Sequence, residues 1–231
     1  DCLQWLNEQQ IPYRFVTNNT TMCRKDLTAK LRRLGLEVDE QEIISANYAG
    51  VLLLEQRGIK RCRLLLRPEA QQDYPTNCLQ NPDAIVIGDI GNRWDYDLLN
   101  ELMNQVLEGA EIIALHKGRY HQGASGLLLD SGAFVAALEH ATGKQAIVVG
   151  KPNPTFFELA SNTFGCTPDE LLMVGDDLIN DIGGAMQMGM HAVLVQTGKY
   201  RKGIVEASTI QPDGCIPSIK ELPAYLQNNI I

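Results

Sequence analysis

Short apolar runs alternate with longer amphipathic segments along most of the chain. Apolar runs of strand length predict strands at residues 13–16, 43–45, 63–67, 84–88, 111–115, 146–150, 171–174 and 191–196. Between them, apolar positions recurring at helical spacing predict helices at 2–9, 24–34, 48–56, 96–107, 132–140, 154–164, 181–190 and 218–227. This alternation predicts an α/β protein with a mainly parallel sheet.

Some segments carry sharper local signals. Residues 96–107 place their apolar side chains on one helical face, namely Leu98, Leu99, Leu102, Met103 and Val106. Asn153 is expected to cap a helix that begins at Pro154, since proline is well tolerated at the first helical position. Residues 116–123 are polar and interrupt the pattern, so a loop is expected there.

Composition and charge exclude several classes of protein. The chain has 231 residues with 28 acidic against 20 basic side chains, a net charge of −8. Nucleic acids and anionic membranes are therefore not expected as partners, because they need clustered Lys and Arg. The one basic cluster, at residues 30–33, is interpreted as a solvated helix face.

The sequence also bears on the cell compartment. No apolar stretch approaches the roughly 18–20 residues that span a bilayer, and no secretory signal is visible. None of the 6 cysteines is spaced as in a CxxC or zinc motif. Reduced thiols in a cytoplasmic protein are therefore expected.

Three predicted strands end in polar residues that could hold a phosphate and a divalent cation. Ligands of open α/β sheets gather beyond the carboxyl ends of the strands. The first of these ends is Thr17, followed by Asn18 and Asn19. The Thr17 hydroxyl and the following amides could bind phosphate oxygens. The alternative is a plain capping turn, which these residue types also favour.

The second strand end carries Lys151, between a buried strand and a helix that opens with proline. A fixed ammonium there could neutralise a phosphoryl group together with an attacking carboxylate. The alternative is an ordinary surface lysine in a strand–helix loop.

The third strand end is acidic. Gly175 is followed by Asp176 and Asp177, and Asp181 is expected to open the next helix. Crowded carboxylates are costly unless a cation neutralises them, and hard oxygen ligands suit Mg²⁺. Asp176 is the best direct ligand, and Asp181 would support the metal either directly or through a neighbouring group. Asp177 could simply favour the N-terminus of the next helix. The alternative is an acidic turn that caps a helix.

Together these motifs resemble a known family. Val16-Thr17-Asn18-Asn19, Gly150-Lys151-Pro152 and Gly175-Asp176 with Asp181 are similar to motifs II, III and IV of the haloacid dehalogenase superfamily. The stretches 141–157 and 183–190 resemble subclass IIA, which carries a C2-type cap. Lys117-Gly118-Arg119-Tyr120 and Ser125–Asp130 resemble its phospholysine phosphohistidine inorganic pyrophosphate phosphatase-like branch.

The resemblance implies an architecture. We expect a Rossmann-like parallel-sheet core at 1–45 and 141–231, and an inserted α/β cap at 46–140. The extra strand–helix units between motifs II and III support this division. Gly88-Asp89 looks like motif IV but falls in the expected cap, so it is set aside.

The resemblance also implies a function. It implies a Mg²⁺-dependent phosphatase for a small phosphorylated substrate or pyrophosphate, working through an aspartyl-phosphate. Thr17 and Lys151 would be catalytic, and Asn18 would help them to bind the phosphoryl group. Asp176 and Asp181 would hold the metal. A homodimer is also compatible with this branch.

One departure from the family pattern leaves alternatives open. Motif I, an Asp-x-Asp pair that supplies the nucleophile, is not present at a first strand end. Asp1 precedes a helix and is no candidate, so the nucleophile is expected in a segment N-terminal to the printed residues. If the chain truly started at Asp1, a catalytically dead phosphate-binding or interaction protein would be the better interpretation. A dehalogenase is disfavoured by the acidic cluster, because that branch needs no Mg²⁺.

The substrate is not readable from the sequence. His116, Lys117, Tyr120 and His121 are polar residues of the expected cap. They either face the substrate or belong to a surface loop.

Overall fold

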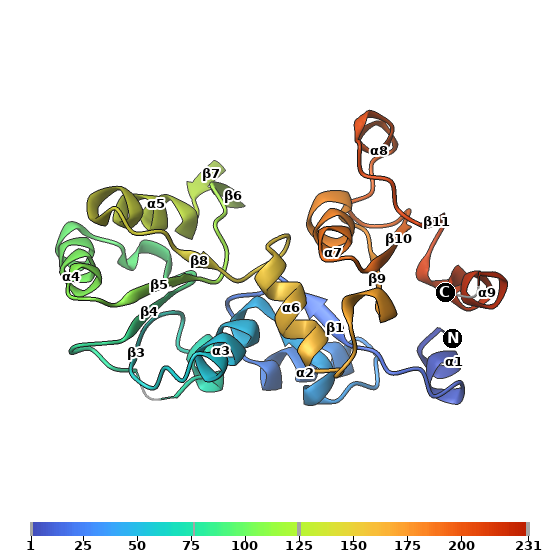
Figure 1. Cartoon of the computed structure of the whole chain (residues 1–231), viewed down its shortest axis with the longest axis horizontal. Helices are drawn as coiled ribbons and strands as arrows, with labels where there is room; N and C mark the ends of the chain where they lie inside the picture. Colours follow the sequence, from blue (N-terminus) through green and yellow to red (C-terminus); the bar gives the residue numbers. More distant parts are fainter. Residues whose placement is uncertain (1, 76, 124–125, 230–231) are drawn as a thin grey trace. The chain divides into compact units, whose positions relative to one another are not determined.

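The computed structural model describes residues 2–75, 77–123 and 126–229, so Asp1 and Ser125 lie outside it (Figure 1). The chain divides into two units by its internal contacts. The central unit is Phe15–Gly150, and the terminal unit is Asp1–Arg14 with Lys151–Ile231. The expected core at 1–45 and 141–231 and cap at 46–140 stay a prediction.

The central unit alternates strands and helices. Its strands are β1 (Phe15–Thr17), β2 (Ile43–Ser45), β3 (Cys62–Leu65), β4 (Ala84–Ile87), β5 (Glu111–Ala114), β6 (Tyr120–Gly123), β7 (Gly126–Leu129) and β8 (Ile147–Val148). Its α-helices are α2 (Arg24–Arg33), α3 (Ala46–Gln56), α4 (Tyr96–Leu107) and α5 (Ser131–Thr142). Short 3₁₀ turns lie at η1 (Glu40–Glu42), η2 (Ala70–Asp73) and η3 (Gly91–Arg93).

Parallel pairing dominates the sheets of the central unit. One sheet has the order β3-β4-β5-β8 and pairs only parallel neighbours, with Ile85 opposite Ile112 and Ile113 opposite Ile147. A second sheet pairs β1 with β2 in parallel. The carboxyl ends of β5 and β8 therefore share one sheet edge, where Gly150 follows β8.

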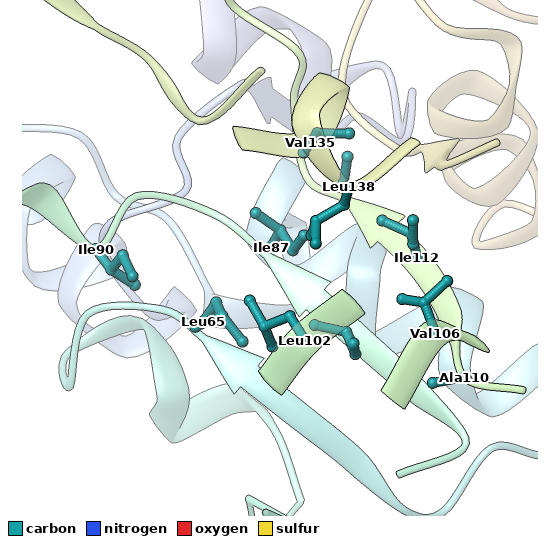
Figure 2. Close-up of a cluster of buried hydrophobic side chains, with 11 residues drawn as sticks. Leu65, Ile87, Ile90, Leu102, Val106, Ala110, Ile112, Val135 and Leu138 are labelled. Atoms are coloured by element: carbon teal, nitrogen blue, oxygen red, sulfur yellow. The ribbon is translucent and has the colours of Figure 1, made fainter. Parts of the chain in front are cut away.

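The core of the central unit forms where α4 and α5 pack on the first of these sheets. Figure 2 shows Leu102 of α4 and Leu138 of α5 with Leu65, Ile87 and Ile112 of the strands. The apolar face predicted for residues 96–107 is the face that α4 buries here. Full burial of a side chain such as Leu102 contributes about 1.5–3 kcal/mol.

The loop predicted at 116–123 is wrong in part. Residues 120–123 form strand β6, which pairs antiparallel with β7 and places Tyr120 opposite Leu129. Both strands are largely exposed, and Leu127, Leu128 and Leu129 are consecutive exposed leucines. Neither strand buries one face, so no alternation of apolar and polar residues marks them in the sequence.

The terminal unit has the same kind of architecture. Its strands are β9 (Leu172–Gly175), β10 (His191–Val195) and β11 (Gly214–Ile216), parallel in the order β11-β10-β9. Its helices are α1 (Cys2–Glu8), α6 (Pro154–Asn162), α7 (Gly184–Gln187), α8 (Lys202–Ala207) and α9 (Leu222–Asn228). Shorter turns are η4 (Pro168–Glu170), the π-helical η5 (Leu178–Gly183) and η6 (Ile219–Glu221).

In the terminal unit, a helix begins where the sequence predicts it when a capping residue is present. Asn153 accepts a hydrogen bond from the Thr155 N–H at 3.1 Å, so the predicted cap in front of Pro154 is confirmed. The predicted helix at 181–190 is wrong at both ends, because η5 already begins at Leu178 and α7 ends at Gln187. Asp181 therefore lies inside this segment and does not open it.

The α/β class with parallel sheets is confirmed in both units. All 6 cysteines lie in the described part of the chain and are free. Within that part, no helix combines the length and the apolar character that crossing a bilayer requires. The cytoplasmic location and the homodimer stay predictions.

Candidate functional site

The terminal unit presents its acidic cluster at the carboxyl end of β9. Parallel pairing with β10 fixes this strand end, and Gly175 is its last residue. A Cβ atom on Gly175 would lie 2.5 Å from Asp181 Oδ2. Glycine is therefore required here, since it lets the Asp181 carboxylate approach the strand backbone.

Lys151 and Asp181 form a buried ion pair. Lys151 Nζ lies 2.7 Å from Asp181 Oδ1, and the two side chains are only 7% and 10% exposed. Lys151 Nζ also lies 5.7 Å from the centre of the Phe156 ring, within the range of a cation–π contact. The alternative of an ordinary surface lysine is therefore wrong.

Asp177 is tied into the start of η5. Its Oδ1 accepts hydrogen bonds from the backbone N–H groups of Ile179 and Asn180, at 3.2 and 3.0 Å. Its Oδ2 accepts from Asn180 Nδ2 at 2.8 Å and from Lys199 Nζ at 3.0 Å. Burial raises the pKa of Asp177, but the Asn180 and Lys199 hydrogen bonds outweigh it and hold that pKa at about 2. The capping role that the sequence allowed for Asp177 is confirmed.

Asp176 is held by the loop that follows β10. The Lys199 backbone N–H donates to Asp176 Oδ2 at 2.7 Å. Gly198 has a left-handed φ of 57°, and a Cβ atom there would overlap the Asp176 carboxylate.

Lys199 is the cation shared by this cluster. Its hydrogen bond to Asp177 is the largest cause that raises the Lys199 pKa, and the charges of Asp177, Asp181 and Asp176 add to it. The lysine therefore stays protonated beside three carboxylates.

The residues at this strand end fit a magnesium ion that is bound through few carboxylates. Across residues 2–75, 77–123 and 126–229, no three His, Cys, Asp or Glu side chains gather closely enough to hold a metal ion. Asp181 is engaged by Lys151 through Oδ1, and its Oδ2 accepts from the Asp177 N–H at 3.3 Å. Asp176, whose Oδ2 accepts from the Lys199 N–H, would be the carboxylate for direct coordination. Mg²⁺ tolerates this, because it keeps several waters and takes one or two carboxylates.

Thr17 and Asn18 lie in the central unit, at the end of β1. Thr17 Oγ1 accepts from the Asn19 N–H at 3.3 Å, and Asn19 Oδ1 accepts from the N–H groups of Thr21 and Met22. The N-cap of α2 is Cys23, so Thr17 does not cap that helix. The loop is a hydrogen-bonded turn at the carboxyl end of a parallel strand.

Asn18 packs against Gly150 within the central unit. A Cβ atom on Gly150 would lie 3.2 Å from Asn18 Oδ1 and 2.5 Å from the Leu115 carbonyl oxygen. The central unit thus joins the expected phosphate loop to the residue that precedes Lys151 in the sequence. The terminal unit joins Lys151 to Asp181. A single site formed by Thr17, Lys151 and Asp176 stays a prediction.

Sequence reasoning missed Lys199 and Gly198. A signal for both was available, because Thr197-Gly198-Lys199 directly follows a buried strand, and ligands gather at such strand ends.

The four polar residues of the expected cap lie in different surroundings. His116 Nε2 lies 2.8 Å from Asp130 Oδ1 and 3.3 Å from Ser131 Oγ. Both contacts use one ring nitrogen, whereas a Ser-His-Asp triad uses two. Lys117 binds Glu139, and Tyr120 and His121 are exposed on β6.

Asp89, set aside in the sequence, binds Arg67 and the Gly91 N–H within the central unit.

Comparison with known proteins defines the class. A family model for haloacid dehalogenase-like hydrolases matches residues 1–75, and a HAD-hydrolase-like model matches residues 148–222. Haloacid dehalogenase-like hydrolase domain-containing protein 2 of Rattus norvegicus is 42% identical over 201 residues, which cover 87% of this chain and 77% of that protein. The chain belongs to the haloacid dehalogenase-like hydrolase family, and the resemblance read from its motifs is confirmed.

More specific relatives agree with this class. Phospholysine phosphohistidine inorganic pyrophosphate phosphatase of Bos taurus is 38% identical over 218 residues, covering 94% of this chain and 80% of that protein. The 4-nitrophenylphosphatase of Thermotoga maritima superposes with a TM-score of 0.84 at 27% identity, covering 96% of this chain and 87% of its own. A p-nitrophenyl phosphatase of Archaeoglobus fulgidus, at 24% identity and a TM-score of 0.85, covers 97% and 90% and shares the fold.

Proposed function

We propose that this chain forms part of a Mg²⁺-dependent phosphatase that hydrolyses a small phosphorylated substrate or pyrophosphate. The observation that carries the proposal is the buried Lys151–Asp181 pair, which lies in the same unit as Asp176 at the carboxyl end of β9. The names of the Bos taurus and Thermotoga maritima relatives support it, because both proteins are called phosphatases.

Lys151 has the charge and the restraint that phosphoryl transfer requires. Catalysis of that reaction consists mainly of positioning and of stabilising the charge on the transferred group. Asp181 holds the ammonium in one place, so it need not reorganise as charge develops. In the proposed reaction, Thr17 and Asn18 bind phosphoryl oxygens, and Lys151 neutralises those oxygens together with the attacking carboxylate.

Asp176 would hold the metal ion, with Asp181 supporting the site through Lys151 and the Asp177 N–H. Mg²⁺, when bound, would neutralise charge on the phosphoryl oxygens. The Lys199 N–H, which donates to Asp176 Oδ2 at 2.7 Å, would restrain the orientation of this carboxylate.

The nucleophile is assigned to the full-length protein. In the proposed reaction, a motif I aspartate attacks phosphorus, and the leaving group departs with a proton from a second carboxylic acid. Water then attacks the aspartyl-phosphate and gives a proton to that second carboxylate, which releases inorganic phosphate and restores both groups. Support for the remaining machinery comes from Asn18, which packs against Gly150, the residue before Lys151.

The test measures release of inorganic phosphate by the full-length protein. Its substrates are a panel of phosphorylated metabolites that includes pyrophosphate, with Mg²⁺ and with EDTA. Asp176→Ala should abolish the Mg²⁺-dependent release. Asp169→Ala, an exposed carboxylate of the same unit, should leave it unchanged. Full activity of Asp176→Ala would reject the assignment, and a wild type that binds phosphate without turnover would favour a non-catalytic binding protein.

A further inference from the structure

Three carboxylates lie within six residues of one another, yet they do not act as one ligand cluster. Within the described part of the chain, no three acidic, His or Cys side chains meet around a common point. Each carboxylate is held by its own set of donors. Asp181 pairs with Lys151, and Asp176 accepts from the Lys199 N–H. Asp177 accepts from the Ile179 and Asn180 N–H groups, the Asn180 side chain and the Lys199 ammonium. The chain therefore keeps apart three groups that the sequence brings together.

Lys199 contributes two hydrogen-bond donors to this separation. Its backbone N–H binds Asp176 Oδ2, and its ammonium binds Asp177 Oδ2. The Lys199 side chain is 71% exposed whereas that of Asp177 is 15% exposed, so the ammonium covers the carboxylate from the solvent side. A substitution of Lys199 removes the ammonium and leaves the backbone donor in place.

The number of carboxylates around a site decides between magnesium and calcium. Mg²⁺ demands near-octahedral geometry and retains waters, so one or two carboxylates suffice. Ca²⁺ accepts six to eight oxygens in flexible geometry, and its affinity rises with the number of charged ligands. A third carboxylate that turned toward the ion would therefore favour Ca²⁺.

We propose that Lys199 is a positioning residue that keeps Asp177 out of the ligand set of the cation and so makes the site select Mg²⁺ over Ca²⁺. This inference rests on the proposed function, because it concerns the metal that Asp176 would hold. It adds a specificity determinant contributed by the loop after β10.

The test is direct binding of MgCl₂ or CaCl₂ to the full-length protein, measured by calorimetry without substrate. In Lys199→Met, Ca²⁺ should bind about tenfold more tightly relative to Mg²⁺. Asp177 Oδ2 then keeps only its Asn180 donor among those described and can accept the cation in place of the ammonium. Loss of a positive charge alone strengthens the binding of both ions, so the ratio of the two affinities isolates the added ligand. Lys199→Arg should restore the wild-type ratio, since a guanidinium can also bind Asp177.

The decisive experiment repeats the Lys199→Met substitution in a protein that also carries Asp177→Asn. Asparagine is as good an N-cap as aspartate, so η5 should keep its start while the third carboxylate is lost. In this background, Lys199→Met should leave the ratio of the two affinities unchanged. Lys202→Met is the matched control, because this exposed lysine of α8 pairs with Glu206 on the same helix.

The outcomes separate the inference from the function on which it rests. A Ca²⁺ to Mg²⁺ affinity ratio within twofold of wild type in Lys199→Met would overturn the inference and leave the magnesium site intact. A shift of the same size in Lys202→Met, or in the Asp177→Asn background, would also overturn it. A wild type that binds neither ion, with no change in Asp176→Ala, would overturn both the inference and the proposed function.

Discussion

The buried pair of Lys151 and Asp181 gives the sharpest stability prediction. Lys151→Met removes the ammonium and leaves a side chain of similar length beside Phe156. The Asp181 carboxylate then loses a partner at 2.7 Å while its side chain is only 10% exposed. It keeps the Asp177 N–H as a donor at 3.3 Å.

The size of the effect follows from this burial. Removing one partner of a buried ion pair costs about 3–5 kcal/mol, because the other charge stays desolvated. We expect about 3 kcal/mol for Lys151→Met, since the Asp177 N–H still stabilises the carboxylate. The double variant Lys151→Met/Asp181→Asn removes both charges and should lie within about 1 kcal/mol of wild type.

Urea denaturation followed by circular dichroism measures these differences through the midpoint and the slope. The double variant also separates stability from catalysis. It should regain most of the lost stability and still release no phosphate in the full-length protein, because the ammonium is gone. A Lys151→Met protein that unfolds within about 0.5 kcal/mol of wild type would refute the buried-pair argument. A double variant with wild-type activity would refute the catalytic role.

Two further predictions concern the carboxylates near Lys199. Gly198→Ala should weaken Mg²⁺ binding about tenfold in calorimetry, because the added Cβ overlaps Asp176 at a left-handed φ of 57°. Gly203→Ala is its control, since a Cβ there meets nothing within 4 Å; equal weakening by both would contradict the prediction. The pKa of Asp177 is lowered from 3.8 to about 2, so its contribution to stability is present above pH 3.8 and lost as the pH falls toward 2. Melting temperatures over that range should fall less steeply in Asp177→Asn than in wild type, and parallel curves would contradict this.

The sequence by itself determined the elements whose signals are local. The helical face at residues 96–107 and the cap at Asn153 both appear as predicted, because each depends on residues within one or two turns. The family was readable as well, since its motifs follow strands that the apolar runs already mark. The exposed hairpin of β6 and β7 was not readable, because neither strand has a buried face.

Only the tertiary structure decided how the site residues are held. Lys151 and Asp181 are thirty positions apart, and nothing local to either one shows that they form a buried pair. Lys199 reaches Asp176 and Asp177 because β10 runs parallel to β9 and brings the two strand ends to one edge. Patterns of apolar and polar residues report burial along one segment, whereas contacts between segments depend on strand register and on close approaches at single glycines such as Gly175 and Gly198.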